Sequence, residues 1–386
     1  MQNSRRLQMQ PETIPCDVLV AGAGVSGLAA AIAASERGAK TLLIEKNDYI
    51  GGTVIAGMHR YLCGLYGTAP SKTLNAGLSR ALVSVLTKRN AVNGPVRLGK
   101  VYGFRFRPKD LLCEFNARIQ MNKKNLKVLL ETQLYAITKE KERILALYAT
   151  VNNTPVCIEP KVVIDASGDG AIIMLSGAKY QVRPPSGRQL AGFSFRVAGI
   201  KGGREMLAIK VPYHVRFATC MPLEKKNECI IRMNVPSGAD TGEIQNEAKR
   251  QMHRLCRVLP EFNHAYIAEF SPSVTEREGL RLQGEYTLTA KDVLSARHFE
   301  DGVVKSAWPI ELWTAERGPQ YRYLEPGAHY EIPLRCLKSK QINNLLACGR
   351  CISATHEALG SVRVAGTCIS LGEQAGITAV KLCESY

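Results

Sequence analysis

The sequence lacks a long, uninterrupted hydrophobic run. Its most apolar stretch, residues 18–34, contains three glycines and a serine. A transmembrane helix needs about 20 consecutive, predominantly apolar residues, so this stretch is better explained as a strand, a turn and a helix. Residues 1–12 are polar and no apolar segment typical of a secretory signal follows them. We therefore expect no membrane span and a cytoplasmic location.

The sequence is also poor in aromatic residues, at 6%, and its 12 cysteines are scattered over 386 positions. Small disulfide-stapled domains carry dense cysteines in short chains, so that class is excluded. Cys348 and Cys351 form a C-x-x-C, but no second pair exists to complete a zinc or cluster site. We expect reduced thiols and no metal, with His298 and His329 at the surface or in structural roles.

The positive charge is concentrated in one part of the chain. Residues 51–150 hold 17 basic and 5 acidic side chains, which gives this stretch +12 of the total +17. A clustered positive field attracts acidic substrates, nucleic acid, anionic lipid or an acidic partner protein. A solvated face that only aids solubility explains it equally well.

A nucleotide-binding motif follows the first apolar segment. Gly22, Gly24 and Gly27 form G-x-G-x-x-G between an expected strand at 16–20 and an Ala-rich helical pattern at 25–37. The first glycine permits a tight turn, the second lets the backbone approach a pyrophosphate, and the third allows close helix–strand packing. Glu45 ends the next expected strand, at 41–44, where a carboxylate can accept hydrogen bonds from a ribose. This order predicts a Rossmann-type βαβ unit.

Two further glycine clusters favour FAD over NAD, because a simple NAD domain needs neither. They are residues 51–53 and the strand and loop VVIDASGDG at 162–170. We also expect helices at 110–121, 241–259 and 367–385. Short strands at 126–131, 134–138, 144–151, 156–159 and 162–164 form an expected antiparallel meander.

With these residues in view, the chain resembles the FAD-dependent oxidoreductase family that is distantly related to the succinate dehydrogenase and fumarate reductase flavoproteins. The similar segments are 18–46, 51–53, 162–173, 277–294, 330–337 and 343–376, of which the last is the most specific. The resemblance implies an α/β fold: a Rossmann-like FAD-binding domain with a β-meander (14–190 and 340–386, with 59–108 as a basic insertion or cap). A second α+β substrate domain (191–339) is inserted before the C-terminal FAD segment.

The resemblance also implies a role in FAD binding for each matching residue. Those expected along the dinucleotide are Gly22, Gly24, Gly27, Glu45, Lys46, Gly52, Thr53, Gly349 and Arg350. Gln133 or Leu134 would meet the adenine, and Ala166, Ser167, Gly168 and Asp169 would form a turn over the cofactor. Gly366 and Thr367 would point a helix N-terminus at the flavin, whose reduced form carries a negative charge that such a terminus stabilises.

The sequence departs from succinate dehydrogenase in two respects. That enzyme's histidine motif for covalent flavin attachment has no match, so we expect non-covalent FAD, with His59 and Cys63 as the candidates if the flavin is covalent. The dicarboxylate-binding pattern is not clearly present either. Succinate or fumarate chemistry is therefore not expected.

Three side chains are candidates for the chemistry. Arg363 and His356 lie seven apart in the specific C-terminal segment, on what we expect to be one loop. Arg363 could bind an anion bidentately, and His356 could donate a proton, since its pKa range is near neutral; alternatively both anchor the loop or contact FAD. Arg277 is either a substrate ligand or half of an ion pair with Glu276 or Glu278.

We therefore expect a flavoenzyme that transfers hydride between flavin N5 and a small organic substrate. No second G-x-G-x-x-G follows residue 38, so electrons would be exchanged with a separate redox protein, quinone, oxygen or transiently bound nicotinamide. Two other functions stay open. One is a tRNA-modifying flavoprotein that uses 51–150 for phosphates, although no aromatic-interleaved basic motif supports nucleic acid. The other is a non-catalytic flavin subunit whose basic stretch binds an acidic partner. A homo-oligomer is also open.

Overall fold

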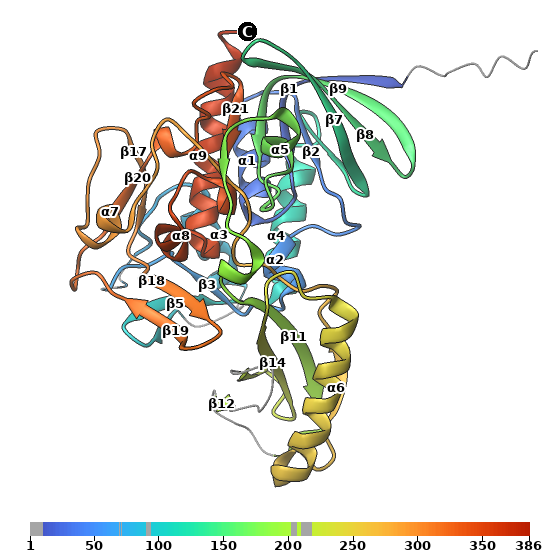
Figure 1. The fold of residues 1–386 in the computed structure, drawn as a ribbon, viewed down its shortest axis with the longest axis vertical. Coiled ribbons are helices and arrows are strands. Elements are labelled where there is room, and N and C mark those ends of the chain that lie inside the picture. The colour runs from blue at the N-terminus through green and yellow to red at the C-terminus, as the bar shows by residue number, and fades with distance from the viewer. Residues whose placement is uncertain (1–10, 69, 71, 90–93, 202–206, 210–217) are drawn as a thin grey trace, which may run out of the picture.

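The computed structural model describes residues 11–68, 70, 72–89, 94–201, 207–209 and 218–386. Its centre is a seven-stranded sheet in the order β6-β2-β1-β9-β8-β7, with β21 paired to β9 (Figure 1). The strands are β1 (Glu12–Ala21), β2 (Thr41–Ile44), β6 (Leu126–Leu129), β7 (Thr132–Glu140), β8 (Arg143–Val151), β9 (Thr154–Asp165) and β21 (Leu345–Ala347). The pairs β6–β2, β2–β1, β1–β9 and β9–β21 are parallel, while β7, β8 and the start of β9 form an antiparallel meander.

The side chains of the central strands alternate between two hydrophobic cores, because successive residues of a strand point to opposite faces. Val18 and Val20 belong to the core that contains α1 (Val25–Ser35), α4 (Pro108–Met121) and α9 (Ala365–Cys383). Leu19 and Ala21 belong to the core formed with the meander and α5 (Ala171–Ser176). Burial on both faces explains why these strands are almost uniformly apolar.

Helices α1 and α9 pack closely along a glycine stripe. A Cβ atom at Gly372 would lie 1.9 Å from the carbonyl oxygen of Ser26, and one at Gly376 would lie 2.2 Å from that of Ala30. Only glycine permits this approach. The packing brings the C-terminal helix against the nucleotide motif, although more than 300 residues separate them in the sequence.

A second sheet stands apart from the first, in the lower part of Figure 1. Its strand order is β12-β13-β14-β11-β15, and all its pairs are antiparallel. The strands are β11 (Ala191–Ala198), β12 (Leu207–Ile209), β13 (Ala218–Pro222), β14 (Glu228–Val235) and β15 (Tyr266–Phe270). Helix α6 (Thr241–Val258), N-capped by Asp240, covers it and contributes Ala248 and Met252 to a core separate from the other two.

Short elements connect and cover these bodies. Between the first βαβ unit and α4 lie α2 (Gly52–Ala56), α3 (Leu78–Lys88) and a small sheet of β3 (Tyr61–Cys63), β4 (Pro95–Leu98) and β5 (Val101–Arg105). The two-stranded sheets are β10 (Tyr180–Gln181) with β16 (Arg281–Leu282), β17 (Gly302–Ser306) with β20 (Tyr330–Pro333), and β18 (Ile310–Thr314) with β19 (Gly318–Arg322). The remaining helices are α7 (Ala290–Leu294), α8 (His356–Val362) and 3₁₀ turns at Pro185–Gly187, Pro260–Phe262, Leu334–Cys336 and Gly349–Cys351.

The α/β fold class and the βαβ unit are confirmed, and the expected helices at 110–121, 241–259 and 367–385 correspond to α4, α6 and α9. Two details of the expected meander are wrong. β6 joins the parallel sheet beside β2, and residues 156–159 and 162–164 belong to the single strand β9. Helix α3 lies in a segment for which no individual helix was predicted. The domain boundaries stay a prediction. Within the described residues, no helix combines the length and apolar content that a membrane span requires.

Candidate active site

The turn between β1 and α1 contains three glycines whose surroundings differ. Gly22 has a φ of +102°, and a Cβ atom there would lie 2.6 Å from the carbonyl oxygen of Ala166. A Cβ atom at Gly27 would lie 1.8 Å from the carbonyl oxygen of Gly22, whereas one at Gly24 would meet nothing within 4 Å. Packing therefore requires glycine at the first and third positions, and open space lies over the second. That pattern matches the roles expected when a pyrophosphate approaches the second glycine.

Helix α1 begins beside this open space without a capping side chain or an acidic residue in its first turn. The N–H groups of a helix's first turn have no partner within the helix, and the helix dipole adds positive potential there. The start of α1 can therefore hold an anion such as a phosphate.

Glu45 supports the glycine turn from the end of β2. One carboxylate oxygen accepts a hydrogen bond from the Ala23 amide at 2.7 Å, and the other accepts from the backbone and side chain of Asn47 at 3.0 and 2.7 Å. The backbone carbonyl of Glu45 accepts from Thr132 N at 2.8 Å, which joins this corner to the start of β7. Leu134 follows two residues later, beside a register shift in β7. A carboxylate has lone pairs left for ribose hydroxyls after these bonds.

The turn after β9 is held by the buried carboxylate of Asp165. This group accepts hydrogen bonds from Ser167 and from the amides of Ile172 and Ile173 at the start of α5, at 2.6 to 3.1 Å. Burial raises the pKa of Asp165 even though these bonds favour its charged form. These hydrogen bonds hold the backbone of Ala166 and Ser167 in contact with Gly22.

Expected cofactor residues from three other segments lie around Arg350, in contact either with it or with its partner Asp169. Its guanidinium donates to the Thr53 hydroxyl at 2.9 Å and lies 3.7 Å from Asp169, which also pairs with Lys46 at 3.1 Å. Gly168 has a φ of +76°, and a Cβ atom there would lie 2.4 Å from the guanidinium. The Nε atom of Arg350 is buried without a hydrogen-bond partner among the described residues. Gly349 precedes it, with a φ of +65° beside Ser26.

The start of α9 is tightly packed. Thr367 is fully buried, and its hydroxyl lies 3.4 Å from that of Ser306. A Cβ atom at Gly366 would lie 2.6 Å from the Leu65 side chain and 2.7 Å from the carbonyl oxygen of Cys63. The segment after β3 therefore covers this turn, and the predicted contact of Gly366 and Thr367 with the flavin stays a prediction. Gly52 lies elsewhere, with its Cα face against Gly24.

A group of cationic side chains lies between α2, β14 and α8. Arg232 of β14 donates from Nη1 to Nε2 of His59 at 2.8 Å. Arg363, the C-cap residue of α8, donates from Nη2 to the side-chain oxygen of Gln189 and to the backbone carbonyl of Glu311, both at 3.2 Å. Arg277 donates to the carbonyls of Leu190 and Ala191 and to the side chain of Asn234, and its guanidinium lies 4.7 Å from the centre of the Trp313 ring. We call Arg232, Arg277, Arg363 and His59 the cationic cluster.

The charge of the cationic cluster is only partly balanced. Glu311 is the carboxylate whose charge acts on all three arginines, and its oxygens accept from the indole N–H groups of Trp308 and Trp313 at 3.0 and 2.6 Å. The Nε atoms of Arg232 and Arg363 and the Nε2 atom of Gln189 are buried with no hydrogen-bond partner among the described residues. Leaving these buried donors without partners carries a free-energy cost.

Burial and mutual repulsion alter the titration of these groups. Burial, with the neighbouring arginines, holds the pKa of His59 well below its usual range, so this imidazole is neutral at pH 7. Burial beside Arg363 lowers the pKa of Arg232 to about 10, and burial lowers the pKa of Arg363 as well. An anion placed here would relieve the repulsion among the three guanidinium groups.

His356 pairs with a buried carboxylate next to the cationic cluster. Its Nδ1 atom lies 2.7 Å from Glu278, which also pairs with Arg281. Burial opposes the charge of Glu278, but His356 and Arg281 outweigh it and hold the pKa of that carboxyl below its usual range. A carboxylate on Nδ1 orients the imidazole and leaves Nε2 to exchange a proton.

Gln189 connects the two groups. Its backbone amide donates to the Glu278 carboxylate at 3.4 Å, while its side-chain oxygen accepts from Arg363. His356, Glu278, Gln189 and Arg363 thus form one hydrogen-bonded path. No local sequence signal marks Gln189, Arg232 or Glu311, because each acts through partners distant in the chain.

Two expectations about these residues are wrong. The suggested ion pair of Arg277 with Glu276 or Glu278 does not form: Glu276 accepts from Ser237 and Gly238 instead. His356 and Arg363 do not share a loop but flank helix α8. The cysteines of the C-x-x-C are fully buried, and burial raises the pKa of Cys348 to about 12, in keeping with inert thiols.

Comparison with known proteins agrees with the nucleotide-binding role that the glycine turn suggests. The sequence profile of the family described as "FAD dependent oxidoreductase" matches residues 17–242 and 210–385. The chain belongs to this family. FAD is accordingly its cofactor, and non-covalent binding is typical of such flavoproteins.

Individual relatives are more distant. A segment of 44 residues is 50% identical to 4-oxocyclohex-2-ene-1-carboxylate 5-dehydrogenase of Sinomonas cyclohexanicum, but covers only 11% of this chain and 8% of that enzyme. A geranylgeranyl bacteriochlorophyll reductase-like protein of Thermoplasma acidophilum is 15% identical, with a TM-score of 0.54 over 97% of this chain and 80% of its own. A flavoprotein/dehydrogenase of Cytophaga hutchinsonii is 14% identical, with a TM-score of 0.51 over 96% and 79%. These two structures support the fold alone.

The residues of this FAD dependent oxidoreductase fit the cofactor. The open space over Gly24, the uncapped start of α1 and the unpartnered Nε of Arg350 can receive the diphosphate, and Glu45 lies where a ribose would follow. The two candidates for covalent flavin attachment were His59 and Cys63. His59 accepts a hydrogen bond from Arg232, and burial raises the pKa of the Cys63 thiol.

Proposed function

We propose that this chain transfers hydride between FAD and a small organic substrate that carries a carboxylate or a similar anionic group. The observation that carries the proposal is the cationic cluster, in which three buried guanidinium groups face one carboxylate, Glu311, whose oxygens are already bonded to two indoles. The unpartnered nitrogens of Arg232, Arg363 and Gln189 supply donors for the substrate's anionic group.

Each residue would have a distinct part in this reaction. Arg232 and Arg363 would bind the anionic group and so orient the carbon that gives or receives hydride. His356, oriented by Glu278, would hold or release the accompanying proton at Nε2. Arg277, committed to backbone carbonyls and Asn234, would position the segment at Leu190 and Ala191 rather than touch the substrate. Bound FAD would supply the two-electron acceptor or donor.

A second redox partner would be needed to complete the catalytic cycle. A separate redox protein, quinone, oxygen or nicotinamide would return the cofactor to its starting state, and the scattered free cysteines suit a reducing cytoplasm. The 44-residue likeness to a dehydrogenase named for a cyclic keto-carboxylate agrees with an anionic, carbonyl-bearing or ring-containing substrate.

The test is a substrate screen by flavin absorbance. The purified holoenzyme is mixed without oxygen with cyclic and short-chain carboxylic acids and with the methyl ester of each. We expect the 450 nm flavin band to bleach with at least one acid and at least about tenfold more slowly with its ester, because the ester lacks the charge that the arginines bind. If oxidised enzyme is inert, dithionite-reduced enzyme is tested for reoxidation by unsaturated acids.

Two arginine variants test the anion-binding role, and a lysine variant is the control. Arg363→Met and Arg232→Met should keep bound FAD and raise the KM for the acid by about 100-fold, in line with the loss of a charge-assisted contact. Lys179→Met, at an exposed lysine outside the cluster, should leave KM unchanged. Equal rates with acid and ester, or unchanged KM in both arginine variants, would refute an anionic substrate at this site.

A further inference from the structure

A second group of chemically capable side chains lies away from the cofactor site, on the sheet formed by β17 and β20. His329 and Glu331 stand two residues apart on either side of the fully buried Tyr330. His329 comes directly before β20 and Glu331 lies within it. His298, from the loop after α7, lies next to them, since the Arg297 carbonyl accepts from the Glu331 amide at 2.9 Å.

The atoms in this group are close together without being bonded to one another. One nitrogen or carboxylate oxygen from each of the three residues lies within 4.8 Å of the other two. The two imidazole rings have centroids 4.8 Å apart, and Nδ1 of His298 lies 4.0 Å from Oε1 of Glu331. That separation is too long for a hydrogen bond. It is somewhat longer than the roughly 3.4 Å between two ligands bonded at about 2.0–2.1 Å to a tetrahedral ion.

Other contacts leave ligand atoms free. The Phe299 amide donates to Oε2 of Glu331 at 3.0 Å, which fixes the carboxylate and leaves Oε1 toward His298. Nε2 of His329 is buried and has no hydrogen-bond partner among the described residues. His298 is more than half exposed, so its ring can rotate to shorten the longest separation toward the roughly 3.4 Å that tetrahedral bond lengths imply.

We propose that His298, His329 and Glu331 bind a divalent transition-metal ion of the zinc type. Two imidazoles and a carboxylate form a ligand set that zinc uses, with a fourth position left for water. The ion would join the loop after α7 to β20 and so stabilise this side of the protein.

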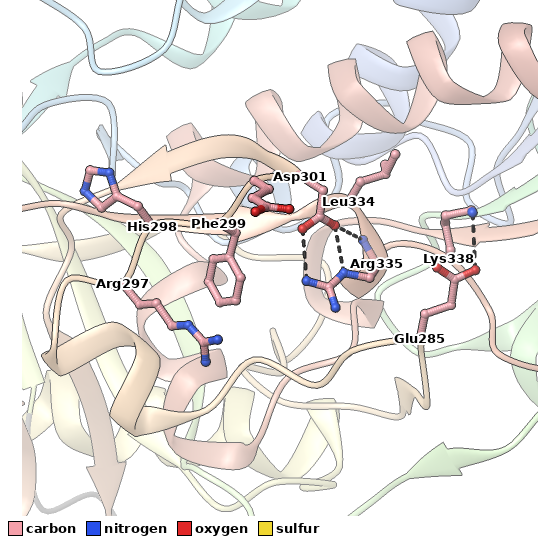
Figure 2. Close-up of a pocket in the computed structure, with 9 residues that line it drawn as sticks. Glu285, Arg297, His298, Phe299, Asp301, Leu334, Arg335 and Lys338 are labelled. Atoms are coloured by element: carbon pink, nitrogen blue, oxygen red, sulfur yellow. Dashed lines mark hydrogen bonds and ion pairs between the residues drawn. The ribbon is translucent and has the colours of Figure 1, made fainter.

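The neighbouring pocket does not explain the cluster. This hollow of about 640 Å³ has His298 at its rim, but Figure 2 shows His298 directed away from the ion pairs that line it. Asp301 pairs with Arg335, and Glu285 with Lys338. These two carboxylates are already paired with cations, so neither is available to the same ion.

Zinc binding is measured by calorimetry on EDTA-treated holoenzyme, with ZnCl₂ as the only titrant, and by thermal unfolding with and without the ion. We expect one site of micromolar or tighter affinity and a Tm raised by about 2–4 °C at saturating zinc. His329→Gln and Glu331→Gln should each weaken this site at least tenfold. The glutamine at 331 keeps an oxygen for the Phe299 amide, so the loop should hold its place.

The matched control is His253→Gln, which removes an exposed histidine of α6 outside the cluster and should bind zinc as the wild type does. FAD content and circular dichroism confirm that each variant is folded. Absence of binding in the wild type, or equal affinity in all four proteins, would overturn the proposal. In the second case exposed thiols or other surface groups account for the zinc.

Discussion

The glycine turn and the cationic cluster are built on opposite principles. At the turn, Gly22 and Gly27 pack against backbone atoms with no spare room, and open space remains only over Gly24. In the cationic cluster, four side chains from distant segments are brought together with nitrogens left unpaired. The first region is packed so tightly that two of its positions admit only glycine. The second leaves buried donors without partners, which carries a cost in stability.

The largest effect is expected where the turn is tightest. Gly27→Ala places a Cβ atom 1.8 Å from a backbone oxygen that cannot move aside without displacing β1. We expect the free energy of unfolding to fall by about 3 kcal/mol or more, since overpacking against backbone cannot be relieved by a rotamer change. Urea unfolding of the FAD-free protein measures it. A variant as stable as the wild type would mean that the turn is looser than described.

Gly24→Ala separates cofactor binding from folding in the same turn. Its backbone has a φ of −66°, which alanine adopts, and the Cβ atom would enter open space. Stability of the FAD-free protein should therefore stay within about 0.5 kcal/mol of the wild type. FAD affinity should fall by about 30-fold, near 2 kcal/mol, because the methyl group occupies the path of the diphosphate. Titration by flavin fluorescence decides it, and undiminished affinity would place the diphosphate elsewhere.

In the cationic cluster, unlike at Gly27, a substitution need not lower the free energy of unfolding. Arg363→Met relieves the repulsion on Arg232 and Arg277 but removes a donor from Gln189 and from the Glu311 carbonyl, so the two effects oppose each other. We expect the free energy of unfolding to stay level or to rise by about 1 kcal/mol. Arg277→Met should instead destabilise by about 2 kcal/mol, because it removes the buried donor to the Leu190 and Ala191 carbonyls and to Asn234. Loss of stability in both variants would remove the contrast between the two regions.

The smallest effect concerns pH. Because burial and the neighbouring arginines lower the pKa of His59, the unfolded chain binds a proton there at a pH where the folded protein does not. Stability should therefore decrease as pH falls below about 6.5, by up to about 1.4 kcal/mol at pH 5.5 from this group. His59→Gln should flatten the slope between pH 7.5 and 5.5 in thermal unfolding. His253→Gln, at an exposed histidine, is the control and should leave the slope unchanged.

Several errors in the predicted secondary structure have local causes. Leu78, Leu82 and Leu86 repeat every four residues, and all three are buried on α3, so this helix could have been recognised from its pattern. Strand β9 contains Pro160 between the two segments that were expected as separate strands, but parallel pairing with β1 continues past it. β6 was grouped with the strands that follow it, whereas its partner β2 precedes it by more than 80 positions.

The sequence by itself determined the βαβ unit and the family, because the glycine spacing and the order of strand, turn and helix are local patterns. The FAD contacts of the three glycines and of Glu45 stay predictions. Tertiary structure alone decided the cationic cluster. His59 and Arg232 are 173 positions apart, and Gln189 and Arg363 are 174 apart, and no local pattern encodes such contacts. The packing of α1 on α9 and the position of the second sheet beside α2 bring them together. The same holds for His298 and β20, which meet only when the loop after α7 folds back on its sheet.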